Sequence, residues 1–309
     1  MFWILPSRAD TLPPHGKPIS RSSKGVLTPI LNLRVFPSHP EVNAMNEDAA
    51  KPISTHMNER IAAELKNIEA SKDVRVLYAC ESGSRAWGFA SEDSDYDVRF
   101  IYVHEPEWYL RLEQARDVIE WKLNEALDIN GWDLSKALRL MRASNPTIFE
   151  WLNSPIVYRE LDAFSAPKEL SGPSFAPRPT IYHYLNMARK NRVDHLSAER
   201  VRLKKYFYVM RSLLAAQWVA EKRTAPPVPF AELVNAELEP AVKPLFDELV
   251  QRKINIPESD LMPHVPELDV WIEHTYQEVE AAIPNVPSFD KPEWDAYDRA
   301  FLDVLGISD

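Results

Sequence analysis

The sequence predicts a mixed α/β (α+β) domain followed by a helical domain. Between residues 74 and 130, short runs of β-branched and aromatic residues alternate with polar loops, which is typical of strands. From about residue 180 onward, apolar residues recur at helical spacing. A length of 309 residues also fits two domains of ordinary size.

The first domain is predicted to begin with a helix at His56, in which Ile61 and Leu65 recur at helical spacing. Asp133 is expected to cap a later helix over residues 134–142. Strands are expected between these two helices, at residues 74–78, 96–103, 117–122 and 127–130.

The predicted domains are residues 56–165, which contain every expected strand, and residues 178–309. A linker rich in Ser, Pro and Ala separates them. Residues 1–50 are expected to be a disordered or non-native N-terminal extension because seven prolines interrupt them and no period emerges, and Met45 and Met57 are alternative starts. In the second domain, helices are expected near residues 180–196, 199–222, 239–253, 268–283 and 292–304.

Composition excludes several classes of protein. No apolar run approaches the roughly 20 residues that span a bilayer, so no membrane partner is expected. A single cysteine, Cys80, excludes an internal disulfide, and with no secretory signal in view we expect a cytoplasmic protein. The net charge of −10 is unlike that of a dedicated duplex-binding protein, so contact with nucleic acid requires a local basic patch. The sequence has no His-x-x-x-His, Cys-x-x-Cys, Walker or G-x-S-x-G pattern, which disfavours a zinc site, a P-loop and a hydrolase elbow.

Two glycines fall within six residues directly after the first expected strand. Only seven glycines occur in the chain, and Gly83 and Gly88 are two of them. Glycine at such a place allows a sharp turn or a close approach of the backbone. Gly83-Ser84 would open a short helix or turn whose unpaired N–H groups suit a phosphate, and the Ser84 hydroxyl can add one hydrogen bond.

Asp95 and Asp97 lie two residues apart at the start of the next expected strand. Side chains at positions i and i+2 of a strand share one face, so the two carboxylates repel each other unless a cation lies between them. Mg²⁺ favours carboxylates together with substrate phosphates, and a two-metal site has this arrangement. An Asp-x-Asp after a polar loop is more often a solvated loop or a strand cap. The order of strand, Gly-Ser, about ten residues, Asp-x-Asp and strand favours the functional interpretation.

This order of motifs resembles the nucleotidyltransferase superfamily of DNA polymerase beta. The fuller strings Glu81–Gly88 and Asp93–Phe100 resemble one branch, the RlaP-like predicted nucleotidyltransferases associated with RNA repair, over roughly residues 58 to 250. Further matches to that branch are Asp128–Leu134, Asn145-Pro146, Glu150-Trp151-Leu152, Ser154–Tyr158 and Lys204–Tyr208.

The resemblance implies a nucleotidyltransferase-type mixed sheet with flanking helices in the first domain, which would be the catalytic one. It also implies a third carboxylate on a later strand. Asp128 is preferred because it lies in the β-prone run 127–130, whereas Asp133, the competitor, lies where a helix cap would. Asp95, Asp97 and Asp128 would then hold two Mg²⁺ ions.

Basic and aromatic residues provide the remaining nucleotide-binding candidates. Lys204, Lys205 and Tyr208 lie beside an apolar stripe on one expected helix, and the resemblance favours contact with the triphosphate or base over a solvated basic face. Arg85 follows the Gly-Ser turn, and it is expected either to reach a phosphate or to pair with Glu81 or Asp93. Arg99 shares the face of Asp97, and it is expected either to act in the site or to hold Asp97 in place by an ion pair.

The function expected from these residues is Mg²⁺-dependent transfer of a nucleoside monophosphate from an NTP to an acceptor hydroxyl. Gly83 and Ser84 would position the phosphates, and Asp128 would help to activate the attacking hydroxyl. An RNA end as the acceptor rests on the resemblance alone. The alternatives are a nucleotide-binding sensor or partner protein without turnover, which predicts that the third carboxylate is missing, and a metal-dependent phosphohydrolase.

Overall fold

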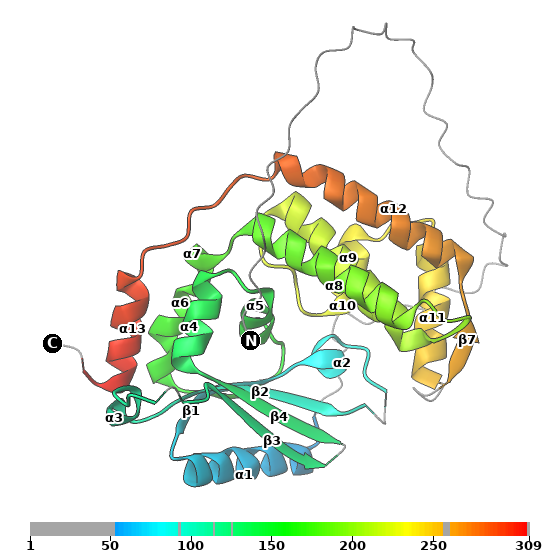
Figure 1. Ribbon diagram of the computed structural model, residues 1–309. Coiled ribbons are helices and arrows are strands. Elements are labelled where there is room, and N and C mark those ends of the chain that lie inside the picture. The colour runs from blue at the N-terminus through cyan, green and yellow to red at the C-terminus, as the bar shows by residue number, and fades with distance from the viewer. Residues whose placement is uncertain (1–52, 92–93, 114, 125, 256–259, 308–309) are drawn as a thin grey trace, which may run out of the picture. The chain divides into compact units, whose positions relative to one another are not determined.

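The computed structural model describes residues 53–307 except 92–93, 114, 125 and 256–259, so the expected N-terminal extension lies outside the described residues. A five-stranded mixed sheet runs in the order β3-β4-β2-β1-β5 (Figure 1). β2 and β4 are parallel, and the other neighbouring strands are antiparallel. The strands are β1 (Arg75–Glu81), β2 (Tyr96–Val103), β3 (Val118–Asn124), β4 (Leu127–Asp133) and β5 (Val157–Glu160).

Helices cover both faces of this sheet, which confirms the predicted mixed sheet with flanking helices. α1 (Thr55–Lys72) packs on one face through Ile61, Leu65 and Ile68, which are fully buried. The Ser54 hydroxyl caps this helix by accepting the Met57 N–H. The other face is covered by α4 (Leu134–Arg142), α5 (Pro146–Leu152), the 3-10 turn η1 (Asp162–Phe164), α6 (Ser165–Glu169) and α13 (Asp295–Leu305).

The second half of the chain is mainly helical, as predicted. α9 lies at its centre, with α8, α10 and α12 packed around it. Residues 200–202 form a short strand rather than the start of α9, and this strand pairs with residues 261–263. The helices are α8 (Pro177–His195), α9 (Leu203–Lys222), α10 (Phe230–Glu237), α11 (Lys243–Asn255) and α12 (Pro266–Ala282), and the short strands are β6 (Arg200–Arg202) and β7 (Leu261–Pro263).

The expected linker between the two halves contains helical structure. α6 lies largely within it, α7 (Ser171–Ser174) follows, and α8 begins at Pro177. Proline opens α8, where its fixed φ suits the first turn of a helix. Pro177, one of the prolines that suggested a linker, therefore marks the start of a helix.

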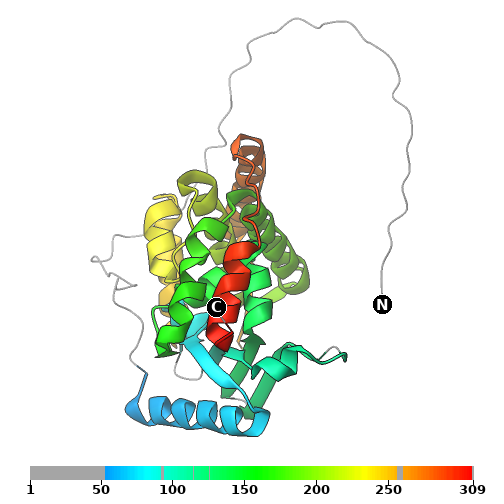
Figure 2. The same cartoon turned by 90° about the vertical axis from the view of Figure 1, so that its left-hand side faces the viewer.

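The last helix returns to the sheet. α13 packs against α4 and α6 (Figure 2), and the Arg75 guanidinium of β1 donates to the Val304 carbonyl of α13 over 2.8 Å. The described residues belong to one compact unit. None of the described helices combines the length and the apolar character that crossing a membrane requires.

Candidate active site

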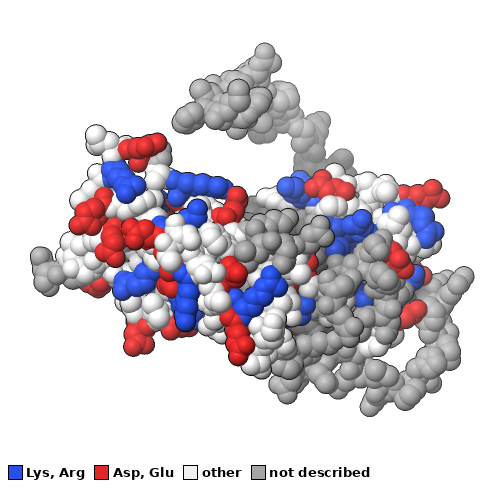
Figure 3. All heavy atoms as spheres, turned by 90° about the horizontal axis from the view of Figure 1, so that it is seen from below, with Lys and Arg blue, Asp and Glu red and all other residues white. Residues whose placement is uncertain are grey.

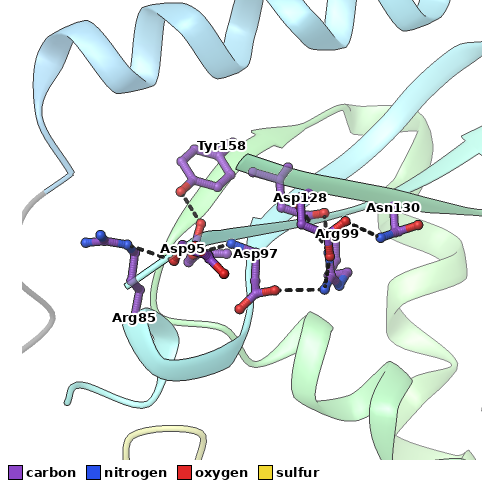
Figure 4. Close-up of polar contacts among 9 residues, drawn as sticks. Arg85, Asp95, Asp97, Arg99, Asp128, Asn130 and Tyr158 are labelled. Carbon is purple, nitrogen blue, oxygen red and sulfur yellow. Dashed lines mark hydrogen bonds and ion pairs between the residues drawn. The ribbon is translucent and has the colours of Figure 1, made fainter. Parts of the chain in front are cut away.

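Two carboxylates lie opposite each other on the parallel strands β2 and β4. The backbone register pairs Asp97 with Asp128 (Figure 4). Their neighbours Val98 and Ile129 are buried against α1, so by strand alternation both carboxylates point to the other face of the sheet. Both side chains stay partly open to solvent, with Asp97 29% and Asp128 38% exposed. The predicted pairing of Asp97 with a carboxylate on a later strand is therefore present.

The Arg99 guanidinium joins these two carboxylates. Its Nη2 lies 2.9 Å from Asp97 Oδ1 and 3.0 Å from Asp128 Oδ2, and its Nη1 donates to the Asp128 carbonyl over 3.2 Å. Asn130 donates to Asp128 Oδ1 over 2.8 Å. Like charges placed opposite each other destabilise a sheet, and this guanidinium reduces the repulsion. Of the two roles expected for Arg99, the structure shows the ion pair.

Gly83 packs directly on the Asp97 carboxylate. It opens the short helix α2 (Gly83–Ala86) with φ of +60°, and a Cβ atom added there would lie 2.1 Å from Asp97 Oδ2. A left-handed φ and this close approach both favour glycine. Ser82 N–H also donates to the Asp97 carbonyl over 2.8 Å, which fixes the turn to β2. The sequence predicted the sharp turn and the short helix correctly, but not that the glycine makes room for a carboxylate of the protein itself.

Asp95 lies just before β2 and is exposed. The Arg85 guanidinium holds the chain at this point, because its Nε donates to the Asp95 carbonyl over 3.1 Å and its Nη2 donates to the Ser94 carbonyl over 2.6 Å. It also lies 3.8 Å from the ring centre of Tyr96, a cation–π distance. Arg85 thus contacts the Asp95 loop rather than forming an ion pair with Glu81, and Asp93 lies outside the described residues.

The pKa of Asp97 is raised above its ordinary value. Burial is the main cause, and the negative charges of Asp128 and Asp95 add to it, while Arg99 opposes the rise. A positive charge placed near these carboxylates would lower that pKa again.

A fourth carboxyl group, that of Glu81, was expected from the sequence only as a possible ion-pair partner of Arg85. It ends β1, is fully buried, and accepts the Asp97 N–H over 2.8 Å and the Tyr158 hydroxyl. Burial raises the pKa of Glu81 to about 7, while those two hydrogen bonds act in the opposite direction. Glu81 was part of the string that carried the family resemblance. The feature of the sequence that could have indicated a role for Glu81 is its position. It is a charged residue at the end of an apolar strand, where a side chain faces the protein interior.

Asp133, the competitor for the third carboxylate, is a structural residue. It is fully buried and caps α4 as predicted, with Oδ1 accepting the Ser135 N–H over 2.8 Å. Its other oxygen accepts the Tyr109 hydroxyl over 2.7 Å. Both carboxylate oxygens of Asp133 are therefore engaged within the protein. Asp133 also lies at the far end of β4, so the length of the strand separates it from Asp128.

The nucleotide-binding candidates on α9 approach α2 through Trp87, the residue that ends α2. The Tyr208 ring meets the Trp87 ring edge-on with 5.6 Å between centres, and Lys205 Nζ lies 5.1 Å from the centre of the Tyr208 ring. Lys205 Nζ also lies 3.2 Å from His195 Nε2. Lys204, Lys205 and Tyr208 are all partly exposed on the first two turns of α9. On the face seen in Figure 3, basic side chains are interspersed with acidic ones.

A sheet with carboxylates on neighbouring parallel strands, next to a Gly-Ser turn, places the chain in the nucleotidyltransferase superfamily. The comparisons with known proteins name the family within it. The model of the RNA repair pathway DNA polymerase beta family matches residues 57–303. The chain therefore belongs to this family, and the resemblance seen in the sequence is confirmed.

The known proteins that are similar to the chain include a bacterial relative and a solved structure. An uncharacterized protein of Bacillus subtilis (strain 168), YcgL, is 44% identical over 253 residues, which cover 81% of this chain and 96% of the relative. The crystal structure of a nucleotidyltransferase-like protein from Exiguobacterium sibiricum 255-15 covers 82% of this chain and 81% of its own, with 11% identity and a TM-score of 0.26.

Proposed function

We propose that this protein transfers a nucleoside monophosphate from an NTP to an acceptor hydroxyl in a Mg²⁺-dependent reaction. The observation that carries the proposal is the pairing of Asp97 on β2 with Asp128 on β4, together with the packing of Gly83 against the Asp97 carboxylate. An RNA end is the acceptor that we propose, and the support for it is membership of a family described by RNA repair.

The chemistry of the donors fits Mg²⁺. Asp95, Asp97 and Asp128 supply carboxylate oxygens, which Mg²⁺ prefers, and one guanidinium, Arg99, balances only part of their charge. Among the described residues, the group of possible metal ligands whose ligand atoms all lie within 4.8 Å of one another consists of Glu239, His274 and Glu278. This group lies outside the site of the three aspartates. The three aspartates are therefore suited to share ions with substrate phosphates rather than to enclose one ion. Bound Mg²⁺ would supply charge stabilisation for the transferring phosphoryl group.

The residues of the chain would do the positioning. The N–H groups of the first turn of α2 have no acceptor within the helix, so Gly83 and Ser84 present donors where a phosphate would lie. Arg85 would keep the Asp95 loop in place through the two carbonyls it binds, and its reach to a phosphate stays a prediction. Lys204, Lys205 and Tyr208 would face the nucleotide from the other side of Trp87.

Asp128 would orient the attacking hydroxyl by accepting its hydrogen bond. The Asn130 amide and Arg99 hold the Asp128 carboxylate from two directions, so its orientation is fixed before substrate arrives. Such preorganisation is the main contribution a protein makes to phosphoryl transfer. The sensor alternative predicted that this carboxylate is missing, whereas Asp128 lies beside Asp97.

The test uses purified protein, Mg²⁺, each α-labelled NTP in turn and a pool of small RNAs. Label should move into RNA with the wild type and be lost with the double variant Asp95→Asn, Asp97→Asn. The matched control is Asp295→Asn, Asp298→Asn on α13, which removes the same two charges far from the site. Release of labelled nucleotide or phosphate without an acceptor would favour the phosphohydrolase. NTP binding without any reaction would favour the sensor.

A further inference from the structure

A cavity of about 310 Å³ opens between α8, α9 and α12. Its volume lies at the lower end of the roughly 300–1,000 Å³ typical of small-molecule sites. It is lined by Ala188, Arg189, Arg192, Val193, Leu196, Ser197, Val209, Leu213, Ile272, Glu273 and Tyr276.

The inner wall of this cavity is apolar. Val209 and Leu213 of α9 are fully buried, and Ile272 of α12 is 2% exposed, so all three belong to the core of the helical region. Leu196, which ends α8, adds a further apolar side chain. A ligand with an apolar body would gain by covering these side chains, because apolar area is removed from water.

The rim carries two arginines with different partners. The Arg192 guanidinium is paired with Glu273, whose carboxylate also accepts from Gln277 over 2.7 Å. Arg189 instead donates to the Tyr276 hydroxyl over 2.7 Å and lies 5.3 Å from the centre of that ring. Among the described residues no carboxylate pairs with Arg189. The rim therefore presents one uncompensated positive charge beside an apolar wall.

The cavity lies on a different face of α9 from the nucleotide-binding candidates. Successive helical residues are rotated by about 100°, so Val209 and Leu213 point more than a quarter turn away from Tyr208. Tyr208 meets Trp87 near the carboxylate site, whereas the other two line the cavity. A ligand in the cavity would contact none of the residues assigned to nucleotide transfer, so this inference does not rest on the proposed function.

We propose that this cavity is a binding site for a small amphipathic anion, with an apolar body on the wall formed by Val209, Leu213 and Ile272 and one anionic group on Arg189. The anion replaces water around a guanidinium that is already oriented by Tyr276. An anionic group that offers two acceptor oxygens, such as a carboxylate, phosphate or sulfonate, matches the paired donors of arginine.

Two fluorescent probes of similar shape separate the charge from the apolar wall. The anionic probe is 8-anilinonaphthalene-1-sulfonate, and the neutral probe is N-phenyl-1-naphthylamine. Arg189→Gln removes the charge, and Ser197→Trp fills the exposed mouth. Arg299→Gln, an exposed arginine on α13, is the matched control. All of these side chains lie at the surface or rim, and circular dichroism checks that each variant is folded.

With the full-length protein, we expect the anionic probe to saturate a single site. Arg189→Gln should weaken it about tenfold, as expected for losing a hydrogen-bonded charge, and should leave the neutral probe within about twofold. Ser197→Trp should weaken both probes, and Arg299→Gln neither. The proposal is overturned if the wild type does not bind the anionic probe, if Arg189→Gln matches Arg299→Gln, or if Ser197→Trp leaves both probes bound.

Discussion

Replacing Gly83 by alanine tests whether the carboxylate cluster depends on the glycine turn. At a φ of +60° an alanine costs about 1–2 kcal/mol in backbone energy. Its Cβ would also lie 2.1 Å from Asp97 Oδ2 and 3.0 Å from Asp97 Cγ. The carboxylate must turn away and loosen its partly exposed pair with Arg99, which adds about 1 kcal/mol. We therefore expect a loss of about 2–3 kcal/mol in the free energy of unfolding.

Two companion variants divide this loss into its parts. Gly306 has a similar φ of +70° with no atom within 4 Å, so Gly306→Ala should show the backbone cost alone. In an Asp97→Ala background the contacting carboxyl atoms are gone and the nearest remaining Asp97 atom is Cβ at 3.4 Å, so Gly83→Ala should also cost only the backbone part.

The assay is thermal or urea unfolding followed by circular dichroism. For a protein of this size each kcal/mol lowers the melting temperature by about 2–4 °C, so Gly83→Ala should melt roughly 5–10 °C lower than the wild type. The reasoning is refuted if Gly83→Ala costs no more than Gly306→Ala. It is equally refuted if the cost is unchanged in the Asp97→Ala background, because the contact would then contribute nothing.

Three further predictions concern buried groups. Asp133→Ala should lower the free energy of unfolding by about 2–4 kcal/mol, because it removes the cap of α4 and leaves the Tyr109 hydroxyl without its acceptor. Asp128→Ala should lower it by only about 1 kcal/mol. Equal losses in urea unfolding would contradict this difference. Burial raises the pKa of the Cys80 thiol, so a disulfide reagent should modify this thiol about 100-fold more slowly in the native than in the unfolded protein. Rapid labelling of the native protein would contradict this and would show that β1 opens. Burial also raises the pKa of Glu81 from 4.5 to about 7, so the folded state binds its proton more tightly than the unfolded chain. The stability from this group is complete below pH 4.5 and falls by about 3 kcal/mol as the pH rises to 7, and Glu81→Gln should flatten that decline; an unchanged pH profile of the unfolding midpoint would refute it.

Elements with strong local signals could be predicted from the sequence. β2 over Tyr96–Val103 and α4 over Leu134–Arg142 match their predicted bounds, because a run of β-branched and aromatic residues defines the strand and Asp133 defines the start of the helix. β5 has only four residues, and its pattern is not apolar. It becomes a strand because β1 offers a free edge, which a local reading of the sequence does not reveal.

The same distinction between local sequence signals and long-range contacts applies to the candidate active site. The spacing of Gly83, Asp95 and Asp97 follows from one turn between adjacent strands, so it is visible in the sequence. The placement of Asp97 opposite Asp128 depends on the parallel register of β2 and β4, for which the family resemblance was the guide. The hydrogen bond from Tyr158 to Glu81 spans 77 positions, and only the placement of β5 beside β1 brings these residues together.

The packing partner of α13 also could not be predicted from the sequence. Its apolar residues predicted a helix, and a helix after four others suggests one more member of the same bundle. Instead Tyr297 and Val304 are buried with α4 in the core on one face of the sheet. Local periodicity tells which side of a helix is buried but not against which partner, because any apolar surface of suitable shape satisfies it.

The helical half of the chain forms part of the support for the site. Trp87 ends α2, and its carbonyl accepts the Phe230 N–H over 2.8 Å. The Arg211 guanidinium lies 4.4 Å from the centre of the Trp87 ring and is itself held by Glu150 of α5 over 2.9 Å. Arg211 is only 3% exposed, and an arginine is buried at such a place only where its charge is paired. The turn that brings Gly83 to Asp97 is therefore anchored from α5, α9 and α10 together, and the geometry of the carboxylates depends on residues that no motif around Asp95 and Asp97 contains.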